Sequence, residues 1–379
     1  MPGGRLRVLL VGNYEPDEQQ SMQRYGEWMQ RSLLARGCVV TMLKPPVAFS
    51  RLATGPFRRP AVVKYLGYID KYVLFPSRLR ALIRKSDLVH ICDHSNAMYL
   101  AATAGVPTVI TCHDLLAVRS ARGEFTSTRT GWSGRRLQDW ILGSLRKASN
   151  VIAVSTRTSE DFRRLTGNTE ARVAVIPNAL NWPYKPRAEF PESLRKRIGR
   201  GLEGGYFLHV GGNQWYKNRP AVVRIFAALS GMEEFKSTCL VMAGKAMPAA
   251  LRKTVEESGL SDRVVSLIGS TNEELEALYS HGQALIFPSL EEGFGWPIAE
   301  AQACGCPVAV TGRAPMTEVA GGAAIYFDPA DPVAAADAIR DGLRKRAELR
   351  EAGLRNVARF EEARIIEEYL SFYATVLAG

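Results

Sequence analysis

Two glutamates in the second half of the chain are spaced so that both could hold the same polar ligand. Glu292 and Glu300 are separated by seven residues, and a glycine-rich turn lies between them. The apolar run 284–287 before this turn is typical of a buried parallel strand. Pro297 suits the first turn of a helix, because its missing N–H costs no hydrogen bond there. The segment therefore predicts a strand, a turn with one carboxylate, and a helix that carries the other.

This arrangement suits a ligand with both phosphate and hydroxyl groups. Free backbone N–H groups at the start of a helix favour an anion. Carboxylates accept hydrogen bonds from hydroxyls. A nucleotide sugar offers both kinds of group. For an isolated pair of glutamates, the alternative is an ordinary strand–turn–helix with a capping glutamate.

The whole segment from Ile286 to Val310 resembles the E-x7-E signature of retaining glycosyltransferases with the GT-B fold, in particular glycosyltransferase family 4. The resemblance implies that Glu300 binds the ribose hydroxyls and Glu292 the hydroxyls of the donor sugar. It also implies retention of the anomeric configuration. The turn between the glutamates joins the expected donor site with Gly293, Phe294 and Gly295.

A histidine follows the buried strand expected at 107–111 in the first half of the chain. By the resemblance, His113 would position donor hydroxyls and support charge near the anomeric carbon. A capping or buried structural histidine is the alternative. Gly12 follows the first strand and could let a diphosphate or acceptor approach the backbone closely. A plain strand-to-loop glycine is equally compatible with that position.

A second glycine turn, at Gly212, precedes Lys217. The resemblance implies that this lysine neutralises the leaving diphosphate. The family usually has an arginine between the glycine turn and the lysine, but Asn213 and Gln214 stand in that neighbourhood. Arg219, on the other side of Lys217, is a further basic candidate for the phosphates. Smaller family-like turns complete the expected nucleotide pocket: Gly244, Lys245, Ile268 and Gly269.

The expected reaction moves a hexosyl-type sugar from a nucleoside diphosphate sugar, such as GDP-mannose or a UDP-hexose, to a hydroxyl of a glycan or lipid-linked acceptor. Cell-surface polysaccharide or glycolipid assembly would be its setting. No D-x-D triplet occurs, so we expect no metal and no cofactor besides this co-substrate. A GT-B relative with other chemistry, such as a nucleotide-sugar epimerase, or a non-catalytic paralogue is the alternative.

Short apolar runs alternate with helical patterns along the 379 residues, which predicts doubly wound α/β domains, and the length suffices for two of them. The resemblance implies the GT-B arrangement, in which two Rossmann-like domains face a cleft. We expect an acceptor-side domain at 1–180, a proline-rich linker at 181–203 and a nucleotide-sugar-binding domain at 204–360. By the resemblance, a terminal helix at 361–379 returns to the first domain. The predicted strands lie near 7–11, 38–43, 87–91, 107–111, 150–154, 173–176, 206–210, 238–242, 264–267, 284–287, 307–310 and 323–326.

Positive charge is concentrated in the first half. Residues 1–203 carry 32 basic and 16 acidic side chains, a net +16, whereas 204–379 carry 17 and 22, a net −5. Segment 51–85 alone holds nine basic residues against Asp70, interleaved with aromatic ones. This pattern suggests contact with an anionic membrane or lipid-linked acceptor. A solvated basic face and a nucleic-acid site are the alternatives, of which we expect the second least.

Neither a membrane-spanning run nor a signal peptide is evident in the sequence. The six cysteines are scattered without C-x-x-C spacing, which favours buried free thiols over a metal site. We therefore expect a cytoplasmic protein, located at the inner face of the membrane if the basic segment binds lipid.

Overall fold

The computed structural model describes residues 5–52, 60–127, 130–199 and 202–379. The chain forms two compact units: the N-terminal unit, 1–177 together with 362–379, and the C-terminal unit, 178–361. The proline-rich stretch 181–203 is therefore part of the C-terminal unit and not a separate linker. Its side chains explain why: Tyr184 is buried and contacts the ring of Tyr279 edge-on, and the N–H of Arg187 donates to Ser280 Oγ.

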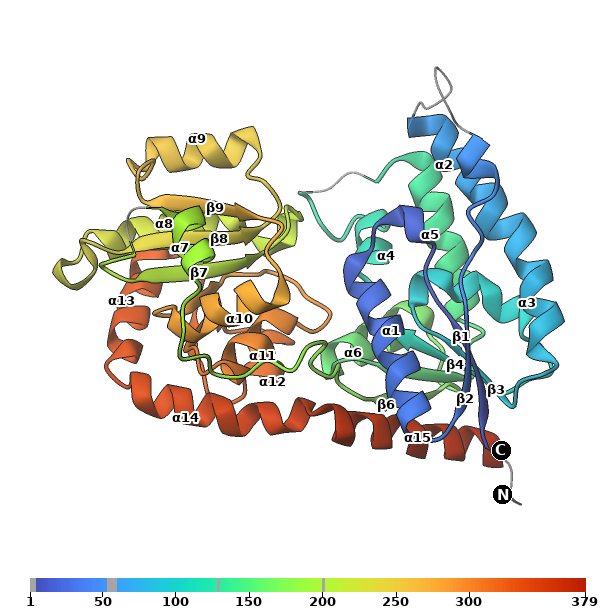
Figure 1. Ribbon diagram of the computed structural model, residues 1–379. Coiled ribbons are helices and arrows are strands. Elements are labelled where there is room, and N and C mark those ends of the chain that lie inside the picture. Colours follow the sequence, from blue (N-terminus) through green and yellow to red (C-terminus); the bar gives the residue numbers. More distant parts are fainter. Residues whose placement is uncertain (1–4, 53–59, 128–129, 200–201) are drawn as a thin grey trace. The chain divides into compact units, whose positions relative to one another are not determined.

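The N-terminal unit is built on a parallel sheet in the order β2-β1-β3-β4-β5-β6 (Figure 1). Its central strands are apolar on both faces because helices cover both faces. All six predicted strands of this half are confirmed to within two residues. They are β1 (Arg7–Val11), β2 (Val39–Leu43), β3 (Leu88–Ile91), β4 (Thr108–Cys112), β5 (Asn150–Ala153) and β6 (Arg172–Val175).

The helices of this unit pack into a core under the sheet that includes Phe75, Tyr99, Ile141 and Phe162. Residues 94–102 form a 3-10 helix, η5 (His94–Ala102), and a π-helical turn, η4 (Asp70–Leu74), joins two helices earlier in the chain. The α-helices are α1 (Gln20–Ala35), α2 (Pro60–Ile69), α3 (Phe75–Ile83), α4 (Leu116–Ala121), α5 (Trp132–Leu145), α6 (Thr156–Thr166) and α15 (Glu362–Ala378).

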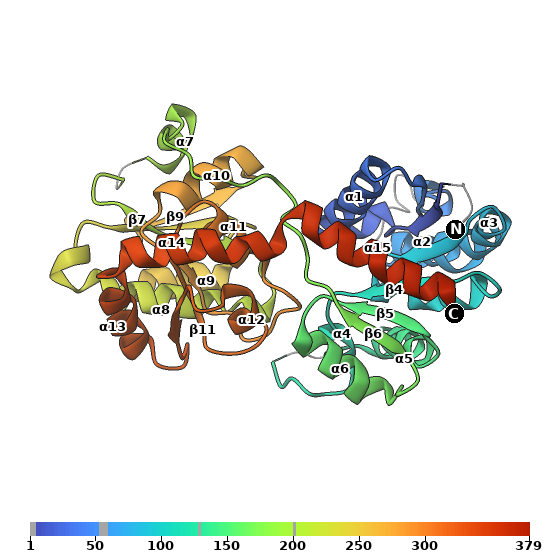
Figure 2. The same cartoon turned by 90° about the horizontal axis from the view of Figure 1, so that it is seen from below.

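The last helix, α15, belongs to the N-terminal unit, as the family resemblance implies. Figure 2 shows it beside α1 and across the strands of that unit. Two buried tyrosines fix it there: Tyr369 Oη lies 2.9 Å from Tyr25 Oη, and Tyr373 Oη lies 2.5 Å from His90 Nδ1. Residues more than 280 positions apart are thus joined inside one core.

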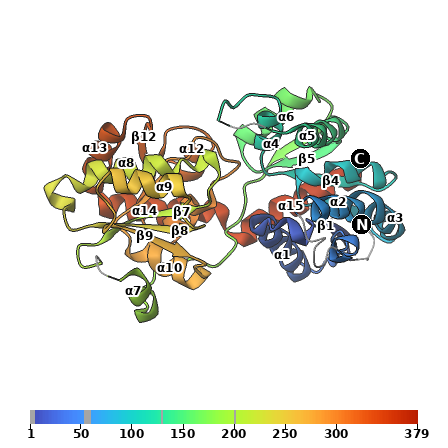
Figure 3. The same cartoon turned by 90° about the horizontal axis from the view of Figure 1, so that it is seen from above.

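The C-terminal unit has a second parallel sheet, in the order β12-β11-β10-β7-β8-β9. Figure 3 shows α8, α9 and α13 on one side of it and α10 on the other. The predicted strands are again confirmed: β7 (Tyr206–Gly211), β8 (Cys239–Gly244), β9 (Val264–Ile268), β10 (Leu285–Phe287), β11 (Val308–Thr311) and β12 (Ile325–Phe327). The helices are α7 (Glu192–Ile198), α8 (Arg219–Ser230), α9 (Ala249–Glu257), α10 (Asn272–His281), α11 (Trp296–Ala303), α12 (Met316–Ala320), α13 (Pro332–Leu343) and α14 (Arg346–Asn356).

The basic segment 51–85 is mostly helical, and its residues 53–59 lie outside the described part of the chain. Phe75 and Leu79 are core residues, whereas Tyr65 and Val73 are more than half exposed. Lys71 pairs with Asp17 at 2.8 Å and lies over the ring of Tyr14. All six cysteines are buried and unpaired, as expected. Among the described residues, no helix is long and apolar enough to span a bilayer.

Candidate functional site

Each sheet has one topological switch point, where strands that follow each other in the sequence are added first on one side of the starting strand and then on the other. In the C-terminal unit this point lies between β7 and β10, because β8 and β9 extend the sheet on one side and β11 and β12 on the other. In the N-terminal unit it lies between β1 and β3. Ligands of open α/β sheets bind outside the carboxyl ends of the strands at such points. A ligand would therefore contact the residues that follow these four strands.

In the C-terminal unit, the loops after β7 and β10 bring Lys217 and Glu292 together. The Lys217 Nζ atom lies 2.7 Å from Glu292 Oε1, and both side chains are largely buried, with 14% and 8% exposed. The ammonium also lies over the ring of Phe287, 5.1 Å from its centroid. A cation and a carboxylate that hydrogen-bond this closely form a charge-assisted pair. Its position is the switch point of the sheet.

The second glutamate of the spaced pair lies in α11, as predicted. Glu300 is buried, and its Oε2 accepts a hydrogen bond of 2.9 Å from the hydroxyl of Tyr279 in α10. Pro297 lies in the first turn of the helix, and Gly295 precedes it with φ near 103°. A left-handed backbone of that kind favours glycine. The turn after β10 thus carries one carboxylate and the helix that follows it carries the other.

Phe294 does not present its side chain as a ligand contact. It is 4% exposed and packs edge-on against Phe360, with ring centroids 5.3 Å apart, and against Trp296. A donor could therefore meet its backbone but not its ring. The side chain anchors the turn on which Gly293 and Gly295 lie, which is a packing role that a motif alone does not reveal.

The remaining turns of the expected nucleotide pocket follow β8 and β9. Gly244 has φ near 133°, and a Cβ atom there would collide with the carbonyl oxygen of Gly211. Glycine is thus required where the ends of β7 and β8 approach each other. Ile268, with 58% of its side chain exposed, and Gly269, with φ near 68°, form the turn after β9. Gly212 lies between β7 and Lys217, on the loop itself.

Arg219 is the first residue of α8 and is 97% buried, since only 3% of it is exposed. Its Nη1 atom donates to the side-chain oxygen of Asn213 and, at 3.0 Å, to the carbonyl oxygen of Lys245. The guanidinium therefore reaches the residue that stands where the family resemblance leads us to expect an arginine. Sequence order alone placed it on the wrong side of Lys217.

In the N-terminal unit, Gly12 follows β1 and His113 follows β4. Gly12 donates its N–H to Leu43 O at 2.9 Å, so it continues the strand register. His113 is 5% exposed, and its Nε2 lies 2.9 Å from Cys92 O, directly after β3. Burial lowers its pKa below 6.5, so the imidazole is neutral at pH 7. A neutral His113 is thus aimed toward the switch point of this sheet.

A polar cluster that sequence reasoning missed surrounds the same switch point. Asp93, directly after β3, is 2% exposed, and its Oδ2 accepts from Asn13 Nδ2 at 2.5 Å and from Ser95 Oγ at 2.6 Å. His94 Nδ1 lies 3.0 Å from Asp93 Oδ1. Burial opposes both charges, yet the carboxylate raises the pKa of His94 and the imidazole helps to hold that of Asp93 far below 3.8. The signal was available: a run of polar residues directly follows a buried strand.

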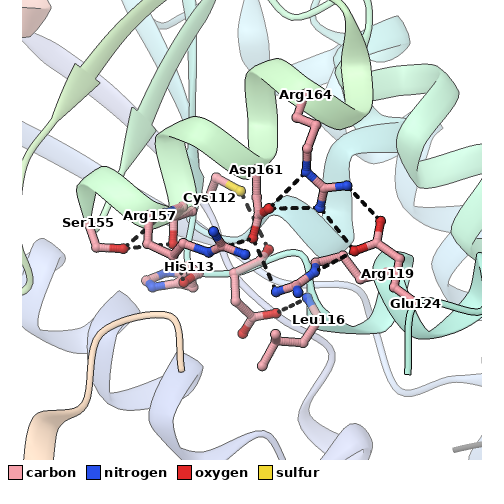
Figure 4. A network of polar contacts seen from close by, with 11 residues as sticks. Cys112, His113, Leu116, Arg119, Glu124, Ser155, Arg157, Asp161 and Arg164 are labelled. Carbon is pink, nitrogen blue, oxygen red and sulfur yellow. Dashed lines mark hydrogen bonds and ion pairs between the residues drawn. The ribbon is translucent and has the colours of Figure 1, made fainter. Parts of the chain in front are cut away.

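An ion network braces the turn that carries His113. Arg119 in α4 donates from Nε to Glu124 at 2.9 Å and from Nη1 to Asp161 in α6 at 3.3 Å. Arg164 donates to both carboxylates at 2.8 Å (Figure 4). Asp161 is 4% and Arg119 6% exposed. The network ties α4 to α6 on the chain segment that follows His113.

The structure therefore joins some of the predicted site residues and leaves others in separate places. Lys217 and Glu292 are in contact, and Arg219 bonds the backbone of Lys245. Gly12 and His113 belong to the N-terminal unit, and each unit is described by itself. Across the described ranges, no cluster of three or more histidine, cysteine or acidic side chains is arranged to hold a metal ion.

Two family profiles match the chain, one for each unit. Residues 24–181 match the profile described as Glycosyltransferase Family 4, and residues 204–345 match Glycosyl transferases group 1. The D-inositol 3-phosphate glycosyltransferase of Corynebacterium diphtheriae is 26% identical over 71% of this chain and 65% of that protein. The O-antigen chain mannosyltransferase RfbU of Salmonella typhimurium is 27% identical over 52% of each chain. The matched part thus spans about half to two thirds of these relatives.

The fold also has solved counterparts. HepE of Anabaena, determined in complex with UDP and glucose, superposes with a TM-score of 0.74 at 17% identity over 98% of this chain and 100% of that one. Such a likeness concerns the architecture of two doubly wound units. Together with the profile matches in both halves, it shows that the chain belongs to glycosyltransferase family 4 and has the GT-B fold.

Proposed function

We propose that this protein is a retaining glycosyltransferase that needs no metal ion and transfers a hexosyl-type sugar from a nucleoside diphosphate sugar to a hydroxyl of a glycan or lipid-linked acceptor. The contact between Lys217 and Glu292 at the β7–β10 switch point carries the proposal. In it a cation and a carboxylate lie within one hydrogen bond of each other, which supports the binding of a diphosphate beside sugar hydroxyls. Relatives named as glycosyltransferases of inositol phosphate and of O-antigen support the acceptor class.

In this reaction the bond between the anomeric carbon and the diphosphate oxygen breaks, and a new bond forms from that carbon to the acceptor oxygen. The acceptor proton passes to the leaving diphosphate. Negative charge accumulates on the diphosphate as the bond breaks, and Lys217 would stabilise it. Glu292 would hold hydroxyls of the donor sugar, and Glu300 those of the ribose. Neither glutamate forms a covalent bond in this scheme.

The N-terminal unit would supply the acceptor side. His113 is buried and neutral, and it donates its Nε2 proton to Cys92 O, so toward a sugar hydroxyl its Nδ1 would act as an acceptor without adding charge. The exposed Tyr65 and Val73 lie in the basic segment and would contact an anionic membrane surface that presents a lipid-linked acceptor. A donor such as GDP-mannose or a UDP-hexose fits the scheme equally well.

The deciding experiment measures nucleotide release from a panel of UDP-, GDP-, dTDP- and ADP-sugars, with a bacterial lipid extract as acceptor source. We expect release from one donor, unaffected by a chelator, and an α- or β-linkage in the product that matches the donor. Glu292→Gln should lower the rate at least tenfold, whereas Glu257→Gln, an exposed change in α9, should not. Release from no donor would refute the proposal, and an inverted linkage would refute its retaining mechanism.

A further inference from the structure

The side chain of Arg219 combines deep burial with incomplete hydrogen bonding. Of its three nitrogens, only Nη1 has partners, Asn213 Oδ1 and Lys245 O. Nε and Nη2 are buried and have no hydrogen-bond partner among the residues that the structure describes. A guanidinium has five N–H donors and no acceptor capacity. The three donors on Nε and Nη2 therefore lack an acceptor among the residues that the structure describes.

The charge of this guanidinium is also uncompensated by the protein. Its two partners are an amide oxygen and a carbonyl oxygen, and none of the ion pairs found in the described ranges includes Arg219. Taking a cation out of water without a counterion is unfavourable. Burial accordingly lowers the pKa of Arg219, although a guanidinium stays protonated in proteins. A bound anion would offset this cost.

The location of Arg219 limits what that anion could be. The guanidinium lies over the carboxyl ends of β7 and β8, held by Asn213 and Lys245, and its backbone begins α8. Asn218, the residue before the helix, makes no side-chain cap. The first turn adds little for an anion, because Pro220 has no N–H and Ala221 donates its own to Asn218 O. Both Arg219 and Lys217 act on the buried imidazole of His209 at the end of β7. Two cations therefore flank the end of one strand, beside Glu292.

We propose that Arg219 binds the diphosphate of the donor and so replaces, from α8, the arginine that the family usually has near position 213. This assignment rests on the proposed function, since it takes the ligand to be a nucleoside diphosphate sugar. Lys217 is neutralised by Glu292, whereas Arg219 has no such partner. Arg219 is accordingly the cation whose charge a diphosphate would compensate.

Asn213 has a definite part in this arrangement. Its Oδ1 accepts from Arg219 Nη1, and its Nδ2 donates to Ala246 O at 2.8 Å. The amide thus bridges the guanidinium to the loop after β8 and fixes one edge of it. The opposite edge, with Nε and Nη2, is the one that would form a two-pronged contact with phosphate oxygens.

The test compares binding of a nucleoside diphosphate and of the matching nucleoside by calorimetry. UDP, GDP, dTDP and ADP are first screened with the wild-type protein, and the tightest is used. We expect Arg219→Met to weaken binding of the nucleoside diphosphate by roughly 10- to 100-fold, the range for the loss of hydrogen bonds to a charged group. The nucleoside should bind unchanged. The control is Arg224→Met, an exposed arginine of the same helix, which should leave both affinities unchanged.

A second variant separates binding from folding. The double variant Asn213→Arg with Arg219→Met restores a guanidinium at position 213 in place of the one removed at 219. We expect it to regain the preference for the nucleoside diphosphate over the nucleoside. An unchanged preference in Arg219→Met, or no recovery in a folded double variant, would overturn the assignment of Arg219 alone. If none of the four diphosphates binds the wild-type protein, both this assignment and the proposed function fail.

Discussion

Lys217 and Glu292 are 75 residues apart in the chain, yet the ammonium of one lies 2.7 Å from the carboxylate of the other. Each side chain comes from the loop after one of the two strands that flank the switch point. The pair is largely buried, so its Coulomb attraction is only weakly screened by salt. A diphosphate that approaches Lys217 must therefore compete with Glu292 for the same cation.

This competition gives a prediction with opposite signs for binding and turnover. In Glu292→Gln the carboxylate charge is gone, so we expect the nucleoside diphosphate product to bind roughly 3- to 10-fold more tightly because Lys217 is released to it. The rate of transfer should fall at least tenfold, since the donor sugar loses a charged acceptor. Calorimetry and a nucleotide-release assay measure the two quantities.

The matched control is Glu257→Gln, which removes a carboxylate from an exposed pair with Lys253 in α9. It should change neither quantity, because exposed pairs contribute little. Weaker diphosphate binding in Glu292→Gln would contradict the view that the glutamate restrains Lys217.

Glu300 gives a second prediction, which concerns the ribose. Its Oε2 accepts a hydrogen bond from the Tyr279 hydroxyl, which fixes the carboxylate in α11. We expect Glu300→Gln to weaken binding of a nucleoside diphosphate by about tenfold, which corresponds to the loss of one charge-assisted hydrogen bond. The 2′,3′-dideoxy analogue lacks the hydroxyls and should bind wild type and variant alike.

Tyr279→Phe is the companion variant because it removes the hydroxyl and keeps the carboxylate. We expect it to weaken the nucleotide less than Glu300→Gln does. If the dideoxy analogue loses as much affinity in Glu300→Gln as the natural nucleotide, the glutamate does not bind the ribose.

The strands could be predicted from the sequence because a buried parallel strand is a short run of apolar residues on both faces. The strand order is not encoded in such runs, yet it decides where the switch points lie. Site residues whose role depends on a contact with a distant part of the chain were therefore hard to predict. Nothing near Arg219 in the sequence shows that its guanidinium turns back to Asn213. Asp93 belongs to no motif, although the polar run that it begins directly after a buried strand is a recognisable signal. The boundary at residue 203 was misplaced because prolines are common in both linkers and packed irregular segments.

The ion network beside His113 predicts a large stability cost for one carboxylate. Asp161 contacts Arg119, which is almost fully buried, and Asp161→Asn removes the charge that faces this guanidinium. We expect the free energy of unfolding to fall by about 3 kcal/mol, as when a buried ion pair loses one partner. Urea denaturation followed by circular dichroism measures this change.

Arg164→Met is the control for this network, because Arg164 touches the same two carboxylates but is half exposed. Its loss should cost less than about 1 kcal/mol. Equal costs for the two variants would show that burial of the Arg119–Asp161 contact does not matter.

His90 predicts how stability depends on pH. It is fully buried between Thr111 in β4 and Tyr373 in α15. Burial, with a smaller contribution from His113, lowers its pKa from 6.5 to about 3. Below pH 6.5 the unfolded chain therefore binds a proton that the folded protein does not, so stability falls as the pH decreases from 6.5 toward 3. The slope for one such group is about 1.4 kcal/mol per pH unit.

His90→Gln removes this titration and keeps a side chain that can bond Thr111 or Tyr373. We expect the thermal midpoint of the variant to be lower than that of the wild type at pH 7.5 but to fall less steeply between pH 6 and 4.5. His281→Gln, at an exposed histidine in α10, should leave the steepness unchanged. Equal steepness in wild type and His90→Gln would mean that His90 does not couple protonation to the attachment of α15. The buried Tyr373 contact explains why this coupling should reach the end of the chain: protonating His90 inside the core is costly, and unfolding of α15 gives the imidazole access to water.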